Sequence, residues 1–132
     1  MRLVKSEYFP NGISFVRLEH KGKFYDGKAK FNKYMEKHPA SPFFGQRIAE
    51  QRAIIKYLKE KRDISRIKKE ALESLKKDVT NENLFNKTKI DQHIKYYDNE
   101  AKNYQKTIAE YKANIKTDIK IRQALLDKVK NK

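Results

Sequence analysis

Seven cationic side chains recur every three to five residues in the middle of the chain. They are Arg47, Arg52, Lys56, Lys59, Arg62, Arg66 and Lys69. On a helix this spacing places most of the charges along one side, where they can follow a phosphate backbone. Arginine grips phosphate with two parallel hydrogen bonds, and four of the chain's seven arginines belong to this set. The set predicts a nucleic-acid interface on RNA or DNA, and the alternative is a solvated helix face.

The residues that most enzymes need do not gather in this sequence. His20, His38 and His93 lie far apart and there is no cysteine, so we expect neither a metal site nor a cofactor. The sequence has no glycine-rich phosphate loop and no nucleophile elbow. Most acidic residues alternate with lysines at helical spacing, which is typical of ion pairs on a helix. We therefore predict that the protein is not an enzyme.

Net charge is the strongest bulk signal, with 32 basic and 17 acidic residues giving +15. Residues 1–40, 41–79 and 80–132 each contribute +5, so the excess does not sit in one tail. Such a surface attracts polyanions. A second interpretation remains open, because 25 of the basic residues are lysine and A/T-rich codons favour lysine.

The cellular compartment is predicted from sequence features that are missing. The first residues, MRLVKSEYFPNG, contain no apolar leader core, and no apolar run approaches the length of a membrane span. The absence of cysteine is typical of a reducing compartment. We expect a cytoplasmic protein without a membrane partner.

Glycine and proline divide the chain, since all of both types lie within the first 45 residues. Residues 1–40 are predicted to form a β-rich head, a two- or three-stranded antiparallel meander with strands at 13–20 and 24–31 and a candidate first strand at 2–9. By alternation Tyr25, Ala29 and Phe31 share one face, which must pack on a helix. A second interpretation uses head aromatics and lysines to stack single-stranded bases. Its residues are Phe15, Phe24, Tyr25, Phe31, Lys23, Lys28 and Lys30.

Residues 41–132 are predicted to form a helical hairpin. Helix one covers about 42–78, with Ser41 as N-cap. Its apolar stripe comprises Phe44, Ile48, Ile55, Leu58, Ile64, Ile67, Ala71, Leu72 and Leu75. Helix two covers about 88–130 and begins at a capping box of Thr88 and Asp91.

Helix two carries a heptad seam whose apolar residues alternate spacings of four and three. The seam comprises Ile90, Ile94, Tyr97, Ala101, Tyr104, Ile108, Tyr111 and Ile115. Beyond it the strict heptad reaches Asp118 and Arg122, so we predict a stutter to Ile119, Leu126 and Val129. The seam pairs either within the chain or between chains, and a dimer is favoured. The predicted fold is α+β, a β-meander packed on an antiparallel two-helix hairpin in one structural domain.

A local pattern resembles small accessory proteins of phages that infect low-GC Gram-positive bacteria. It runs from Gly27-Lys28-Ala29 through Phe44 to a helix reading G-x-x-I-A-x-x-R-A. In that helix the matching residues are Gly45, Ile48, Ala49, Arg52 and Ala53. The resemblance covers about a quarter of the chain and implies a bacterial host cell and a binding role.

The resemblance and the charge together predict a non-enzymatic protein that binds nucleic acid or a host nucleic-acid–protein complex. By analogy it inhibits a host defence nuclease, as anti-CRISPR proteins do. Two alternatives stay open. One is a coiled-coil oligomeric adaptor with no nucleic-acid role, and the other is sequestration of a small anionic nucleotide where the head meets helix one.

Overall fold

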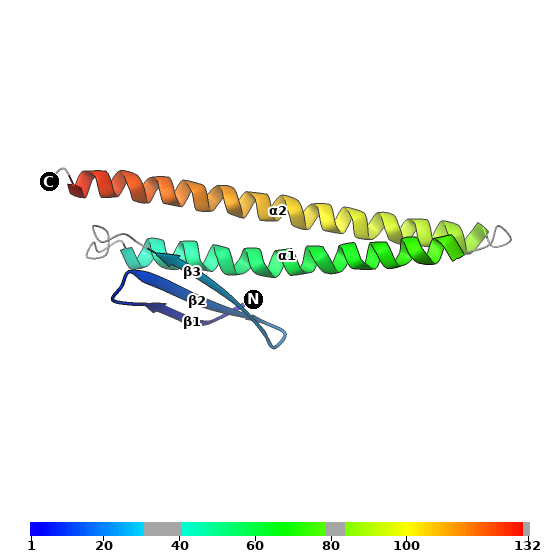
Figure 1. Ribbon diagram of the computed structural model, residues 1–132, viewed down its shortest axis with the longest axis horizontal. Coiled ribbons are helices and arrows are strands. Elements are labelled where there is room, and N and C mark those ends of the chain that lie inside the picture. The colour runs from blue at the N-terminus through cyan, green and yellow to red at the C-terminus, as the bar shows by residue number, and fades with distance from the viewer. Residues whose placement is uncertain (31–40, 79–83, 131–132) are drawn as a thin grey trace. The chain divides into compact units, whose positions relative to one another are not determined.

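The computed structural model describes residues 1–30, 41–78 and 84–130, which form three strands and two helices (Figure 1). The strands are β1 (Arg2–Tyr8), β2 (Ile13–His20) and β3 (Lys23–Lys30), and the helices are α1 (Ser41–Asp78) and α2 (Leu84–Lys130). A three-stranded antiparallel sheet packs against two long helices, which confirms the predicted α+β class. Phe31 and residues 79–83 of the predicted connection lie outside the described residues.

The sheet is a meander with strand order β1-β2-β3. Between β2 and β3 the turn places Lys21 at φ 51° and Gly22 at φ 78°, the positive angles that a two-residue hairpin turn requires. This turn fixes an unbroken register from His20 opposite Lys23 to Ile13 opposite Lys30. In β1 the register shifts between Leu3 and Lys5.

The chain forms two compact units, and each helix contributes to both. The sheet unit comprises residues 1–57 and 109–132, and the hairpin unit comprises residues 58–108. The division therefore falls within the helices. Each unit is described separately below.

In the sheet unit, β3 approaches the first turns of α1 very closely. A Cβ atom placed on Gly27 would lie 1.8 Å from the carbonyl oxygen of Ala49, so only glycine fits there. Ala49 and Ala53 are fully buried, and Tyr25 and Ala29 flank Gly27 on the same buried face of β3. Small residues on both elements are therefore what allow the strand to lie directly on the helix.

This contact gives a physical reason for the pattern that carries the phage-protein resemblance. Gly27 meets Ala49 and Ala53, and Arg52, the arginine of the same pattern, donates to the carbonyl of Lys28 at 2.7 Å. The pattern therefore describes how a strand packs on a helix.

The predicted stutter in α2 is wrong, because the heptad continues with polar residues. Asp118 is 3% exposed, and Leu125 packs against the core. Arg122, between them, is half-buried. Ile119 is also half-buried, and the side chains of Leu126 and Val129 are outside the described set. The sequence pattern indicated a stutter because a carboxylate and a guanidinium occupy heptad positions that apolar side chains normally fill.

In the hairpin unit, polar pairs across α1 and α2 establish an antiparallel register. Partners on α2 descend in number as those on α1 ascend. The pairs are Arg62 with Gln105 at 2.6 Å, Ser65 with Glu100 at 2.9 Å, Lys69 with Asp98 at 2.8 Å and Lys76 with Asp91 at 2.6 Å. Ala101 and Ile108 of the seam are buried within the single chain, so the seam pairs within the chain. The predicted dimer therefore gains no support from this seam.

Two sequence-based details of the helices need correction. In the distal part of α1 most of the predicted apolar stripe is exposed: Ile67 is 63% and Leu75 51% accessible to solvent, and Ile64 and Ala71 are exposed too. Leu72 is half-buried, and together with Leu75 it lines a hollow of about 410 Å³ beside Ile90 and His93 of α2. The side of α1 that faces α2 carries the buried Ser65 instead. The spacing of the apolar residues rotates them gradually away from this side along the helix. The second correction concerns α2, which begins at Leu84, so Thr88 lies inside the helix and does not cap it.

Candidate nucleic-acid interface

Positive charge, which is even along the sequence, is uneven between the two units. The sheet unit has 19 basic and 8 acidic residues, a net of +11, whereas the hairpin unit has 13 and 9, a net of +4. The topology causes this, because it brings the amino-terminal strands and the lysine-rich end of α2 into one unit. A polyanion is attracted mainly to the sheet unit.

Arg47, the first of the predicted phosphate-binding residues, forms a hydrogen bond within the sheet unit. Its Nε donates to Oδ2 of Asp118 at 2.9 Å, and the same oxygen accepts from Nε2 of Gln51 at 2.8 Å. A buried carboxylate needs such donors, because water cannot reach it. Arg47 therefore has a structural role that is sufficient to explain its presence.

Arg52 is likewise committed, together with an arginine that the sequence analysis placed in no site. β3 is an edge strand, and its carbonyls at Lys28 and Lys30 accept hydrogen bonds from Arg52 and Arg122 at 2.7 and 3.1 Å. The two guanidiniums protect backbone acceptors that an edge strand would otherwise expose. Burial lowers the pKa of Arg122, and the nearby charge of Arg52 lowers it further.

The predicted residues of the hairpin unit divide into paired and exposed side chains. Arg62 is 18% exposed and donates to both Asp63 and Gln105. Lys69 donates to Asp98, and this hydrogen bond raises the pKa of Lys69. Arg66 is half-exposed with a long 3.9 Å contact to Asp63, and Lys59 is exposed.

Arg47 and Lys56 are the members of the predicted set that lie exposed in the sheet unit, and Arg47 is paired with Asp118. The charges of Lys56 and Lys28 both contribute to lowering the pKa of Asp26, after the larger effect of the hydrogen bond from Arg17. On α2 the same unit exposes Lys112, Lys116 and Lys120, which recur every four residues. Lys21, Lys23, Lys30 and Lys128 are exposed in the same unit, so phosphate can meet lysines on β3, on α1 and on α2.

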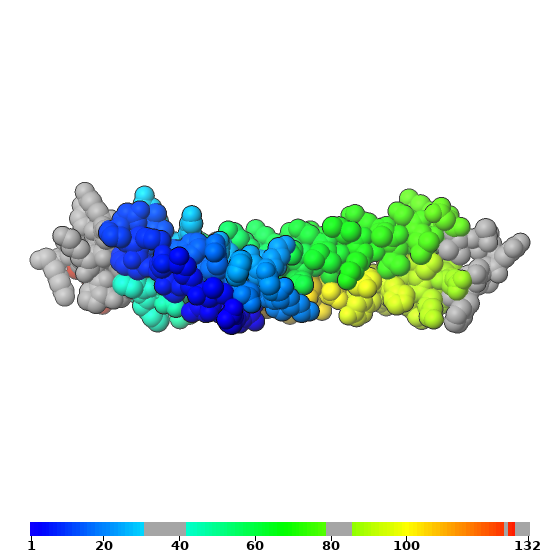
Figure 2. Space-filling model, turned by 90° about the horizontal axis from the view of Figure 1, so that it is seen from below, coloured from blue at the N-terminus to red at the C-terminus, as the bar shows by residue number. Residues whose placement is uncertain are grey.

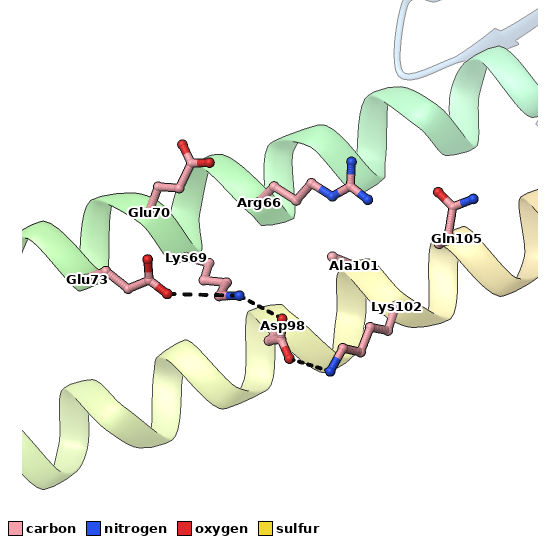
Figure 3. A pocket seen from close by; sticks show the side chains of 8 residues that line it. All are labelled: Arg66, Lys69, Glu70, Glu73, Asp98, Ala101, Lys102 and Gln105. Atoms are coloured by element: carbon pink, nitrogen blue, oxygen red, sulfur yellow. Dashed lines mark hydrogen bonds and ion pairs between the residues drawn. The ribbon is translucent and has the colours of Figure 1, made fainter.

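A groove of about 370 Å³ lies between the helices of the hairpin unit (Figure 3). Its charges balance, with Arg66, Lys69 and Lys102 against Glu70, Glu73 and Asp98. Asp98 receives hydrogen bonds from Lys69 and Lys102, which lower the pKa of Asp98 to about 2. Three cations face three carboxylates, so the groove offers no net charge to a polyanion.

One alternative from the sequence is a site for a small anionic nucleotide where the head meets helix one. A hollow of about 250 Å³ beside the start of α1 is lined by Phe43, Gln46, Arg47 and Glu50. Its one arginine is paired with Asp118, and Glu50 repels an anionic nucleotide.

Among the residues that the structure describes, no three histidine, aspartate or glutamate side chains gather as metal ligands. No described helix is apolar over the length that crosses a membrane.

Comparison of the chain with protein-family models, curated proteins and solved structures finds no match.

Sequence reasoning missed three charged residues with defined places in the sheet unit: Arg17, Asp118 and Arg122. Asp118 and Arg122 continue the heptad of α2, so a strict extension of that heptad would have found them. Arg17 follows Phe15 at the strand period of two, which indicates that the two share the outer face of β2. Its contacts with β3 have no signal in the sequence.

Proposed function

We propose that this protein is a non-enzymatic nucleic-acid-binding protein whose sheet unit forms the binding surface. The observation that carries the proposal is the concentration of +11 of the net charge in that unit. Exposed lysines from β3, α1 and α2 supply contacts to phosphate, each of which releases counterions and adds affinity without reading sequence.

The structural roles of the arginines narrow the proposed surface. In the sheet unit Arg47 and Arg52 are hydrogen-bonded to protein groups, so Lys56 is the member of the predicted stripe that we keep in the proposed surface. Lys28 and Lys56 both act electrostatically on Asp26, and Lys112, Lys116 and Lys120 add exposed cations on α2. These five lysines define the phosphate-contacting set that we propose.

A narrower role follows from the phage-protein resemblance. In it, the protein acts in a bacterial host cell by occupying the nucleic acid, or nucleic-acid–protein complex, of a defence nuclease. Support for this role comes from the Gly-Lys-Ala strand end and the G-x-x-I-A-x-x-R-A helix, together with the net charge.

Paired lysine variants in the two units test where binding occurs. A double variant, Lys28→Gln with Lys56→Gln, removes two cations from the sheet unit. The matched control, Lys95→Gln with Lys106→Gln, removes two exposed cations from the hairpin unit. With a labelled 20-nucleotide strand, we expect the first variant to flatten the dependence of log affinity on log salt by about 1.4, and the control to leave it unchanged. Equal effects of the two variants would contradict the proposed location.

The oligomeric adaptor is a second candidate, and the exposed apolar row on α1 favours it. Ile64, Ile67 and Leu75 are 36%, 63% and 51% exposed in the hairpin unit, whose charge is nearly balanced. Sedimentation would decide, with Ile67→Glu as the variant and Ile121→Glu, equally apolar and 49% exposed on α2, as its control. The adaptor requires an assembly that Ile67→Glu dissociates and Ile121→Glu preserves, whereas a monomeric wild-type protein excludes it.

A further inference from the structure

The outer face of the sheet carries aromatic rings as well as charge. Alternation along β2 and β3 buries Val16, Leu18, Tyr25 and Ala29 against the helices. The opposite face bears Phe15, Arg17 and Glu19 from β2 and Phe24, Asp26 and Lys28 from β3. Glu19 lies directly opposite Phe24 and is paired with Arg2 at 2.8 Å. In Figure 2 the strands, in blue, lie at the surface of their unit.

Arg17 is held between the two phenylalanines of this face. Its guanidinium carbon lies 5.7 Å from the centre of the Phe15 ring and 5.2 Å from that of Phe24. Asp26 fixes the guanidinium from directly across the strands, accepting from Nε at 2.8 Å and from Nη2 at 3.0 Å. The three side chains form a row of planar groups whose central member cannot swing away without losing both hydrogen bonds and both ring contacts.

The exposure of this row has no structural explanation within the sheet unit. Phe24 is 51% exposed although the unit has a buried face that accommodates aromatic rings. Burying an aromatic side chain is strongly favourable, so Phe24 has apolar area left for a ligand. The Arg17–Asp26 pair is partly exposed too, with side chains 39% and 35% accessible. A bulky apolar partner would remove water from this ion pair. The free-energy cost of that desolvation can exceed the gain from the partner's apolar contacts.

A nucleobase meets these conditions. It is flat, stacks on an aromatic ring or on a guanidinium plane, and has polar edges that leave the ion pair hydrated. Lys28 stands directly opposite Phe15 across β2 and β3, where it can reach the phosphate that accompanies a stacked base. In a duplex the faces of the bases are already stacked on one another, so the surface fits an unpaired strand.

We propose that the outer face of the sheet binds single-stranded nucleic acid by stacking bases on Phe24 and Phe15, with Arg17 positioned between the rings. This inference rests on the proposed nucleic-acid function and adds the strandedness of the ligand and the residues that contact its bases. Lysines provide attraction that is sensitive to salt, whereas the aromatic row provides affinity that salt does not screen.

The test uses the full chain and a labelled 20-nucleotide single strand, with the duplex of the same sequence as comparison. Phe24→Leu keeps an apolar side chain and removes the stacking surface, and Phe43→Leu is the control, since Phe43 is a 61% exposed aromatic residue on α1 of the same unit. We expect Phe24→Leu to weaken single-strand binding about fivefold or more with an unchanged salt dependence. We expect Phe43→Leu to match the wild type, and the duplex to bind more weakly than the single strand.

A second variant gives a direct readout of stacking. The chain has no tryptophan, so Phe24→Trp introduces a single tryptophan, which can be excited at wavelengths that the eight tyrosines do not absorb and which keeps a flat ring at this position. We expect this variant to retain affinity and its fluorescence to be quenched by the single strand. Binding without quenching, or equal effects of Phe24→Leu and Phe43→Leu, would overturn the stacking surface and leave the proposed function standing. Failure of the wild-type protein to bind either nucleic acid would instead overturn the proposed function itself.

Discussion

Arg47 on α1 donates a hydrogen bond of 2.9 Å to Asp118 on α2, and Asp118 is almost completely buried. The two residues are unequal partners, because the side chain of Arg47 is 56% exposed and that of Asp118 is 4% exposed. Water can replace the carboxylate for Arg47, but nothing except protein can satisfy Asp118 and its other donor, Gln51.

This asymmetry predicts different costs for removing the two residues. Asp118→Ala leaves the buried amide of Gln51 without its carboxylate acceptor and should lower the free energy of unfolding by about 1–3 kcal/mol. Arg47→Gln should cost more, about 3 kcal/mol, because it removes the charged partner of a carboxylate that water cannot reach. Urea denaturation measures both values, and a cost for Arg47→Gln below that of Asp118→Ala would show that the burial of Asp118 does not decide the energetics.

The contact between β3 and α1 predicts that Gly27 tolerates no side chain. In Gly27→Ala the new methyl group overlaps the backbone of Ala49, which cannot rotate away as a side chain could. We expect a loss of about 1–3 kcal/mol, as for other overpacked positions. Gly22→Asn is the control, since Asn accepts a positive φ and nothing lies within 4 Å of the site. Thermal unfolding should separate the two variants, and equal stability would disprove the close approach.

Acid should weaken the hairpin unit through Asp98. Hydrogen bonds from Lys69 and Lys102 lower the pKa of Asp98 to about 2, below its ordinary 3.8. The folded protein therefore binds this proton less readily than the unfolded chain does. The stabilisation is complete above a pH of about 4 and is lost as the pH falls toward 2.

The variant Asp98→Asn isolates this effect in thermal unfolding. Its Tm should lie below that of the wild type at neutral pH, and the difference should shrink between about pH 4 and pH 2. Glu110→Gln, at an exposed site on α2, serves as the control with a small difference throughout. A gap between wild type and Asp98→Asn that persists unchanged at pH 2 would refute the assignment.

Arg62 and Lys56 should separate stability from binding. Arg62 is mostly buried between Asp63 and Gln105, so Arg62→Gln should destabilise the protein and leave nucleic-acid affinity nearly unchanged at temperatures where it stays folded. Lys56 is exposed, and Lys56→Gln should show the reverse pattern. Unfolding curves and binding titrations on both variants check this, and weaker binding by Arg62→Gln would restore the predicted stripe on α1.

The sequence indicated most of the fold because its local signals agree with one another. The turn at Lys21 and Gly22, the alternating strands and the heptad seam of α2 all point to the observed elements. The exposed row at Ile64, Ile67 and Leu75 could not be foreseen in the same way. An apolar stripe shows that a helix has a face, but which face meets α2 depends on long-range pairs such as Ser65 with Glu100.

The candidate site was harder to predict for a related reason. Arginines at helical spacing are equally compatible with phosphate binding and with internal pairing. Only the tertiary partners of Arg47 and Arg52, which lie 71 and 24 residues away along the chain, distinguish the two roles. The unequal charge of the two units also depends on topology, because it appears when residues 1–57 and 109–132, which are far apart in the sequence, are counted together.

The central claim is that this chain binds nucleic acid through contacts with phosphate. The most direct measurement is a fluorescence-anisotropy titration of the wild-type protein with a labelled 20-nucleotide strand at 50 and 200 mM salt. We predict clear binding at 50 mM that weakens about tenfold or more at 200 mM, because several lysines release counterions together. No detectable binding at 50 mM, or an affinity that salt leaves unchanged, would contradict the claim.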